Sequence, residues 1–115
     1  MANIIPDAFK SELLSGTHNF ANGGNTFKIA LFTDISGYST SSTAYSTTNE
    51  VSSSGTNYSA GGNALDSQAV SVASNTALVD FADEVFSSVT LSAVGAVIYN
   101  DTNSDKLVVV LDFGG

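Results

Sequence analysis

Only a few side chains in this 115-residue chain could take part in acid–base, nucleophilic or metal chemistry. His18 is the only histidine, and the chain has no cysteine. A catalytic triad needs a nucleophile and an orienting acid beside its histidine, and the sequence has no Gly-x-Ser-x-Gly elbow. The glycine pairs at 23–24 and 61–62 lack the lysine and the strand–helix context of a phosphate-binding loop. The sequence therefore predicts no catalytic residue and no cofactor, and we expect that the protein is not an enzyme.

The segment Asp101–Asp105 imitates the start of a calcium-binding loop, and Asp112 stands at the twelfth position. Lys106, however, occupies the position at which such a loop needs glycine for its sharp turn. The residues Leu107–Leu111 are also too apolar and β-branched to wrap around an ion. We therefore interpret Asp101–Asp105 as a hairpin turn whose Asp and Asn side chains bond the backbone, and we predict no metal site.

A second acidic group consists of Asp80, Asp83 and Glu84. Paired carboxylates can serve acid–base catalysis or bind a divalent cation. Here they lie at a predicted strand end, with no histidine, arginine or lysine nearby in the sequence. We interpret the group as a solvated turn, and a weak subunit contact or cation site is the alternative.

The charge balance limits the classes of partner. The chain has a formal net charge of −8, with three lysines and no arginine. Phosphate binding needs clustered cations, so the sequence predicts no contact with nucleic acid and none with an anionic membrane surface. No stretch reaches the ~20 apolar residues of a membrane span, and the first residues do not have the pattern of a signal peptide. We expect one domain, residues 1–115, that is made in a cytoplasm and not exported by that route.

The first predicted element is a helix over about residues 6–15. Pro6 suits a first helical turn, and Gly16 offers a stop. Phe9 and Leu13 continue an apolar stripe that begins at Ile5 with a spacing of four residues. This stripe has two interpretations: the helix covers the domain's own sheet, or it is an arm that docks on a neighbouring subunit. Phe9 and Leu13 are therefore candidate partner contacts.

The rest of the chain has the patterns of strands. Residues 26–33 alternate in a way that indicates a strand with both faces partly covered. Residues 69–73 and 77–81 flank a Ser-Asn turn and predict a hairpin, and residues 90–99 and 107–113 predict a second one. We expect Gly95 to mark a bulge or a close backbone approach. The sequence thus predicts a mainly β fold, a small β-sandwich or barrel over about residues 26–113, with one short N-terminal helix.

A long stretch from Ser39 to Ser59 is dominated by serine and threonine, which account for 13 of its 21 residues. Its regularly placed aromatic residues argue against a flexible linker, and we expect a partly ordered loop. Tyrosine is enriched at interfaces because it combines a large apolar face with a polar tip. The tyrosines either pack the loop on its own domain or contact a neighbouring subunit. The candidate contacts are Tyr38, Tyr45, Tyr58 and Tyr99.

Six patches along the chain, in this order and at these spacings, are similar to a known family. They are Lys28–Thr33, Thr43–Val51, Tyr58–Gly62, Asp80–Asp83, Gly95–Asn100 and Val109–Gly114. The chain resembles, from about Pro6 to Gly115, a family of small structural proteins from tailed bacteriophages. The segments 44–50 and 98–100 are the most specific matches. Relatives commonly continue past the final Phe-Gly with another β-rich stretch, so we expect an open sheet edge where this chain stops.

The resemblance implies a structural, non-enzymatic function. It supplies no catalytic residue and implies a short helix followed by a compact β domain. We expect a structural virion protein, foremost a capsid decoration (cement) protein that binds the major capsid protein, as a homo-oligomer or a symmetric array on the particle. A tail, neck or fibre-base protein is the first alternative. A carbohydrate-binding adsorption module ranks lower, because such modules use aromatic platforms and this chain has no tryptophan.

Overall fold

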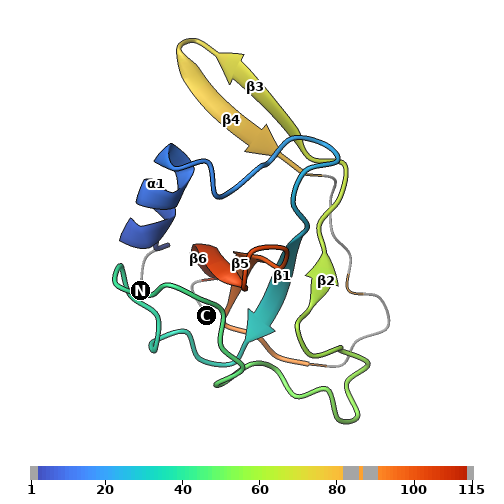
Figure 1. Ribbon diagram of the computed structural model, residues 1–115. Helices are drawn as coiled ribbons and strands as arrows, with labels where there is room; N and C mark the ends of the chain where they lie inside the picture. Colours follow the sequence, from blue (N-terminus) through green and yellow to red (C-terminus); the bar gives the residue numbers. More distant parts are fainter. Residues whose placement is uncertain (1–2, 82–85, 87–90, 114–115) are drawn as a thin grey trace.

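The computed structural model describes residues 3–81, 86 and 91–113, and these form a mainly β domain with one short helix and two antiparallel sheets (Figure 1). One sheet has four strands in the order β2-β1-β5-β6, and the other is the hairpin β3-β4. The predicted fold class is confirmed, and the two sheets are compatible with a small β-sandwich. The elements are α1 (Asp7–Leu14), β1 (Phe27–Phe32), β2 (Asn63–Ala64), β3 (Ala69–Ala73), β4 (Thr76–Asp80), β5 (Gly95–Asn100) and β6 (Lys106–Asp112).

Helix α1 begins one residue later than predicted. Pro6 is the N-cap residue with extended backbone angles, and Asp7 places a negative charge in the first turn, where the helix dipole favours it. The helix ends before Gly16, whose φ of 74° terminates the helical backbone. None of its residues is fully buried, although it packs against β6. None of the helices in the described part of the chain could span a membrane.

Both faces of the four-stranded sheet carry core side chains, as the pattern of β1 predicts. Ala30 and Phe32 belong to a cluster with Tyr38 and Tyr99 on one face. The alternate residue Leu31 packs with other side chains on the opposite face. Figure 1 shows the connections wrapping around this sheet, which explains why a single strand can be apolar on both sides.

The outer edges of the four-stranded sheet are covered in part by isolated bridges. Ile4 pairs with Val110 and Ala44 with Lys106 along β6, while Glu50 pairs with Phe32 along β1. The strands with a free long edge are instead those of the hairpin β3-β4, since that sheet has only two strands among the described residues. The open edge predicted where the chain stops would lie along β6, and the bridges of Ile4 and Ala44 cover part of that edge.

The two predicted hairpins are both present. β5 pairs with β6, with a bulge between Ile98 and Tyr99, and the polar turn between them is the one predicted. Residues 91–94 precede β5 and are not strand, so the hairpin is shorter than predicted. Gly95 lies where a Cβ atom would be 2.5 Å from the carbonyl oxygen of Leu111, which confirms the expected close approach.

The second hairpin, β3-β4, projects from the rest of the domain (Figure 1). Its two-residue turn places Ser74 and Asn75 at positive φ angles of 50° and 68°, which matches a type I′ turn. All ten residues of the two strands are exposed. The sequence correctly predicts the hairpin, but it does not predict that the hairpin stands out from the core.

A substitution at Gly62 tests the close packing at the edge of β1. A Cβ atom there would lie 1.8 Å from the carbonyl oxygen of Ile29, and the φ of Gly62 is +79°. We predict that Gly62→Ala lowers the free energy of unfolding by more than about 2 kcal/mol, which corresponds to a decrease in Tm of roughly 10 °C. Thermal unfolding followed by circular dichroism measures this change.

Gly37→Ala is the matched control, because a Cβ atom on Gly37 would meet no atom within 4 Å. This variant should unfold within a few degrees of the wild type. Equal Tm values for the two variants would contradict the packing described at Gly62.

Candidate functional site: an apolar interaction surface

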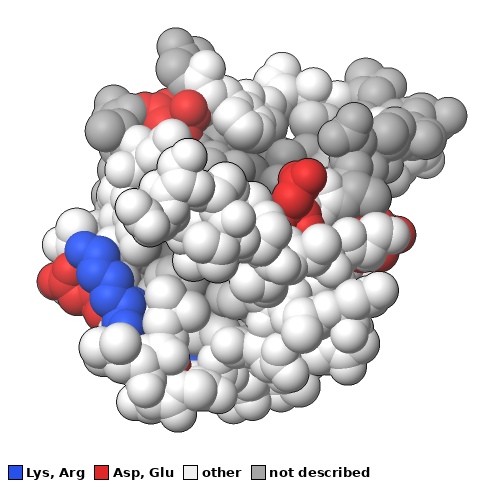
Figure 2. Space-filling model, turned by 90° about the horizontal axis from the view of Figure 1, so that it is seen from above, with Lys and Arg blue, Asp and Glu red and all other residues white. Residues whose placement is uncertain are grey.

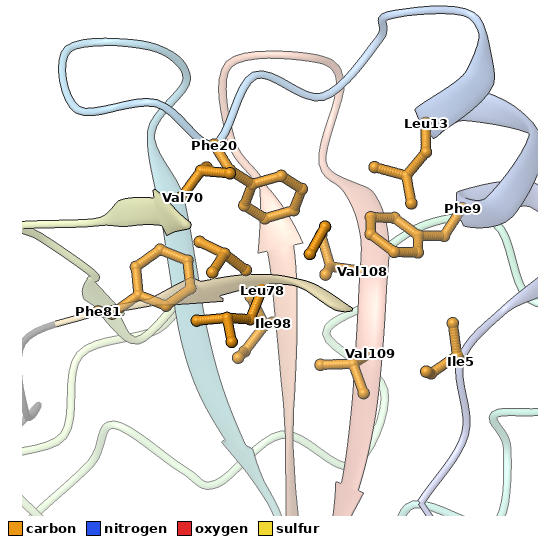
Figure 3. A pocket seen from close by; sticks show the side chains of 12 residues that line it. Ile5, Phe9, Leu13, Phe20, Val70, Leu78, Phe81, Ile98, Val108 and Val109 are labelled. Carbon is orange, nitrogen blue, oxygen red and sulfur yellow. The ribbon is translucent and has the colours of Figure 1, made fainter. Parts of the chain in front are cut away.

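An apolar groove of about 640 Å³ lies between α1, the four-stranded sheet and the hairpin β3-β4. Figure 3 shows its walls. Phe9 and Leu13 of the helix line one side, together with Ile5, which precedes α1. The floor consists of Ile98 from β5 and of Val108 and Val109 from β6. The hairpin side consists of Val70, Ala77, Leu78 and Val79, and Phe20 and Phe81 complete the lining.

The hairpin continues this apolar surface outward. Val70 pairs with Val79 and Val72 with Ala77, so these four side chains lie on one face of the two strands. Val70 is 55% exposed and Val72 is 74% exposed. Large contiguous apolar patches are uncommon on monomeric proteins, so this surface is a candidate interaction site.

No charged side chain lines the groove among the described residues, although the chain as a whole carries a net charge of −8. Figure 2 shows a face of the molecule that is mostly uncharged, with acidic side chains in separate small groups. Two of the three lysines are engaged with carboxylates of their own chain, Lys10 with Asp7 and Lys106 with Glu12. The surface therefore suits an apolar partner better than a strongly charged one.

Phe9 and Leu13, the two predicted contact residues of the helix, both lie in this groove. Leu13 is 45% exposed, so it is accessible to a partner. Phe9 is partly buried and contacts the rings of His18 and Phe20. The helix thus packs on its own sheet and still presents a face to the groove, and docking on a neighbouring subunit stays a prediction.

The four tyrosines lie elsewhere. Tyr38, Tyr58 and Tyr99 are 7%, 3% and 2% exposed. The interpretation of these three as exposed partner contacts is wrong, and the alternative, packing on their own domain, is confirmed. Tyr45 is partly buried and stacks on Tyr99 with ring centroids 4.3 Å apart. An aromatic platform for carbohydrate is therefore not formed by these tyrosines.

The carboxylate of Glu50 organises the tyrosines. Its Oε1 accepts a hydrogen bond of 2.5 Å from the Tyr45 hydroxyl, and its Oε2 accepts one of 2.6 Å from Tyr58. The backbone N–H of Gly61 donates to the same Oε2 at 2.7 Å. Hydrogen bonds to a charged acceptor are stronger than neutral ones, so these three donors hold the loop firmly.

The same loop is attached through its backbone. The N–H of Val51 donates to the carbonyl of Leu31, and the N–H of Thr33 donates to the carbonyl of Asn49, both at 2.9 Å. The Tyr58 hydroxyl accepts a hydrogen bond from the N–H of Leu31. The Ser/Thr-rich stretch is thus an ordered covering of the sheet, as its tyrosines led us to expect.

The environment of Tyr45, Tyr58 and Tyr99 raises the pKa of their hydroxyls. Burial, and then hydrogen bonding to Glu50, raise the pKa of Tyr45 and of Tyr58 well above the ordinary value. Burial, and then the negative charges of Asp105 and Asp101, raise the pKa of Tyr99 in the same direction. These hydroxyls therefore keep their protons at neutral pH and donate them in hydrogen bonds, Tyr45 and Tyr58 to Glu50 and Tyr99 to Gly61.

His18 belongs to a buried polar network. Its Nε2 is 2.8 Å from Glu12, and its Nδ1 is 2.9 Å from the amide nitrogen of Asn100. The amide oxygen of Asn100 accepts from the backbone N–H groups of Thr102 and Asn103, so the amide nitrogen must face His18. His18 Nδ1 is therefore the acceptor, and Nε2 donates to Glu12.

The acidic candidates do not form a site in the described part of the chain. Asp80 is exposed at the end of β4, and Asp83 and Glu84 lie outside the described residues. In the turn between β5 and β6, Asn103 uses its amide to donate to the carbonyl of Thr17 at 2.6 Å. Within residues 3–81, 86 and 91–113, no group of His, Asp or Glu is arranged to hold a metal ion.

Comparison of the chain with protein-family models, curated proteins and solved structures finds no match.

Sequence reasoning missed two parts of the site. The exposure of Val72 and its neighbours depends on how the hairpin leaves the core, for which the sequence has no local signal. Glu50 stands among serines and threonines, and its isolation in that stretch was the one available indication that a carboxylate there has specific partners.

From the raised pKa values of the tyrosines we predict that the free energy of unfolding decreases at alkaline pH. The unfolded chain ionises tyrosine at about pH 10, whereas the folded protein retains these protons to higher pH. This contribution is fully present below about pH 10 and is lost as the pH rises, with a slope of up to about 1.4 kcal/mol per pH unit for each such tyrosine. Urea unfolding between about pH 8 and pH 11 measures it.

Tyr45→Phe keeps the stacked ring but removes one of these hydroxyls, so its stability should decline less steeply above pH 10 than that of the wild type. Identical slopes for the two proteins would contradict the role given to the Tyr45 hydroxyl.

Proposed function

We propose that this protein is a non-enzymatic structural component of a tailed-phage virion, foremost a capsid decoration protein that binds the major capsid protein. It would join the particle in the host cytoplasm and occupy it as a symmetric array. The observation that supports a structural function is the uncharged groove beside the exposed hairpin. The resemblance of the sequence patches to phage structural proteins supports the virion as its location.

The use of the polar side chains supports the same proposal. Two described groups that could do chemistry are engaged within the domain: Glu50 with tyrosine hydroxyls, and His18 with Glu12 and Asn100. No buried side-chain nitrogen or oxygen among the described residues lacks a hydrogen-bond partner. Such a domain offers a shaped apolar surface, which is what a protein that assembles requires.

The apolar surface also determines the kind of contact. Leu13, Val109 and Leu78 approach the groove from the helix, the sheet and the hairpin, so a partner that fills it would bury apolar area on three sides. Burial of apolar surface contributes roughly 25 cal/mol per Å² and depends little on salt at moderate concentration. Binding to the particle should therefore survive moderate salt.

Copy number in purified particles tests the proposal. Quantitative mass spectrometry of the phage that encodes this chain should find the protein in particles, in a fixed ratio to the major capsid protein. A copy number that matches one ring or one set of fibres would place it in the tail or neck instead. Absence from washed particles would contradict a virion function altogether.

Substitutions at two adjacent leucines test whether the groove is the surface that binds the particle. Leu13 lines it, whereas Leu14, which is 92% exposed, does not. We predict that Leu13→Ser weakens binding to particles that lack the protein by at least about tenfold, or ~1.4 kcal/mol. Leu14→Ser, which changes the same residue type on the same helix, should bind as the wild type does.

Co-sedimentation with the particles over a range of protein concentrations gives both affinities. Circular dichroism shows beforehand that both variants are folded. Equal retention of the two variants would mean that the groove is not the contact surface.

A further inference from the structure

We propose that β3 is a self-association strand, through which two copies of the chain pair antiparallel about a two-fold axis at Ser71. The proposal deepens the proposed structural function, on which it rests, by naming a second copy of this chain as the partner of the hairpin. It follows from the free edge of β3, from its sequence and from its lack of charged residues.

No described residue occupies the outer edge of β3, so that edge is available for pairing. β3 pairs only with β4 in its sheet, and no backbone hydrogen bond connects residues 69–73 to other described segments. A two-residue turn makes Ala73 and Thr76 the first bonded pair of the hairpin. The backbone N–H and C=O groups of Val70 and Val72 therefore point outward. An isolated two-stranded hairpin is marginally stable in water, so added strands would stabilise it.

The sequence of β3 is a palindrome, Ala-Val-Ser-Val-Ala. When two copies run antiparallel with Ser71 opposite Ser71, each alanine lies opposite an alanine and each valine opposite a valine. In this register Val70 and Val72 of opposite copies become the hydrogen-bonded pairs, and Ser71 becomes the closer, non-hydrogen-bonded pair. The pairing thus uses the groups that already point outward.

The resulting sheet would have one continuous apolar face. Val70 and Val72 lie on the same face of the hairpin as their partners Val79 and Ala77. The pairing places the valines of the two copies side by side in the middle of a four-stranded sheet. A two-fold antiparallel contact places residue i opposite residue j in both halves whatever the sequence, and the palindrome adds that each residue faces one of its own type.

The edge carries none of the features that prevent pairing. β3 contains no charged residue and no proline, and its ladder with β4 has no bulge. The charged residue of the hairpin strands, Asp80, lies on β4. In the paired sheet the two β4 strands are separated by three strand spacings, about 14 Å, which exceeds the Debye length at physiological salt. The acidic chain can therefore approach a copy of itself here.

The edge of β4 is less suitable. An antiparallel pairing about Leu78 would put Thr76 of each copy opposite Asp80 of the other, so two carboxylates would lie on the paired strands themselves. The palindrome and the absence of charge favour β3.

A cysteine cross-link tests the register directly, because the wild-type chain has no cysteine. In the proposed pair the Cα atoms of the two Ser71 residues would be about 4.5 Å apart, within the range of a disulfide. We expect Ser71→Cys to oxidise to a covalent dimer. Val72→Cys is the control, since its two copies would be about 8 Å apart and outside that range.

A charge variant tests the affinity. Wild-type protein should sediment as a dimer in analytical ultracentrifugation. Ser71→Lys places two ammonium groups opposite each other at the axis and should weaken the dimer by roughly tenfold or more. Ser53→Lys adds the same charge in the exposed loop and should leave the dimer intact.

A monomeric wild type, or equal cross-linking of Ser71→Cys and Val72→Cys, would overturn the proposal. Monomeric Ser71→Lys can then be added to particles that lack the protein. Its binding tests the virion function separately from the dimer, so the failure of one is distinguishable from the failure of the other.

Discussion

The hydrogen bonds to the Glu50 carboxylate are the interactions on which the attachment of the Ser/Thr-rich loop to the sheet depends. The carboxylate receives three hydrogen bonds, from Tyr45, from Tyr58 and from the backbone of Gly61. Tyr99 then donates to the carbonyl of Gly61 at 2.6 Å, so the group reaches from the loop into β5. A partly buried carboxylate that loses such donors is destabilising, and this makes the attachment of a very polar loop specific.

This attachment uses polar side chains inside the domain and thereby determines which surfaces are left for a partner. The tyrosines and the histidine are used inside the domain, and the side of the sheet next to α1 keeps an apolar groove that its own chain does not fill. The hairpin β3-β4 extends that surface into solvent. The division between a closed polar interior and an exposed apolar side is the basis for proposing that the protein assembles.

Much of the fold could be predicted from the sequence, because strands and turns depend on local pattern. The alternation in β1 and the Ser-Asn turn at 74–75 identified the strands, and the stripe of Phe9 and Leu13 identified the helix and one side of the groove. The tyrosines could not be placed, because their partners are distant: Tyr58 meets Leu31, and Tyr99 meets Gly61. An interface tyrosine and a core tyrosine have the same sequence signal, and only the tertiary contacts distinguish them.

Hydrogen exchange on the free protein, read by mass spectrometry, shows whether the loop around Glu50 is held on the sheet. The amides of Tyr45 and Val51 should exchange slowly, because they donate to Asp105 and Leu31 and lie beside buried side chains. The outward amides of Val70 and Val72 should exchange quickly at low protein concentration. Fast exchange throughout residues 43–58, together with slow exchange in β3 of the monomer, would mean that the loop is not held on the sheet and that the edge of β3 is not available.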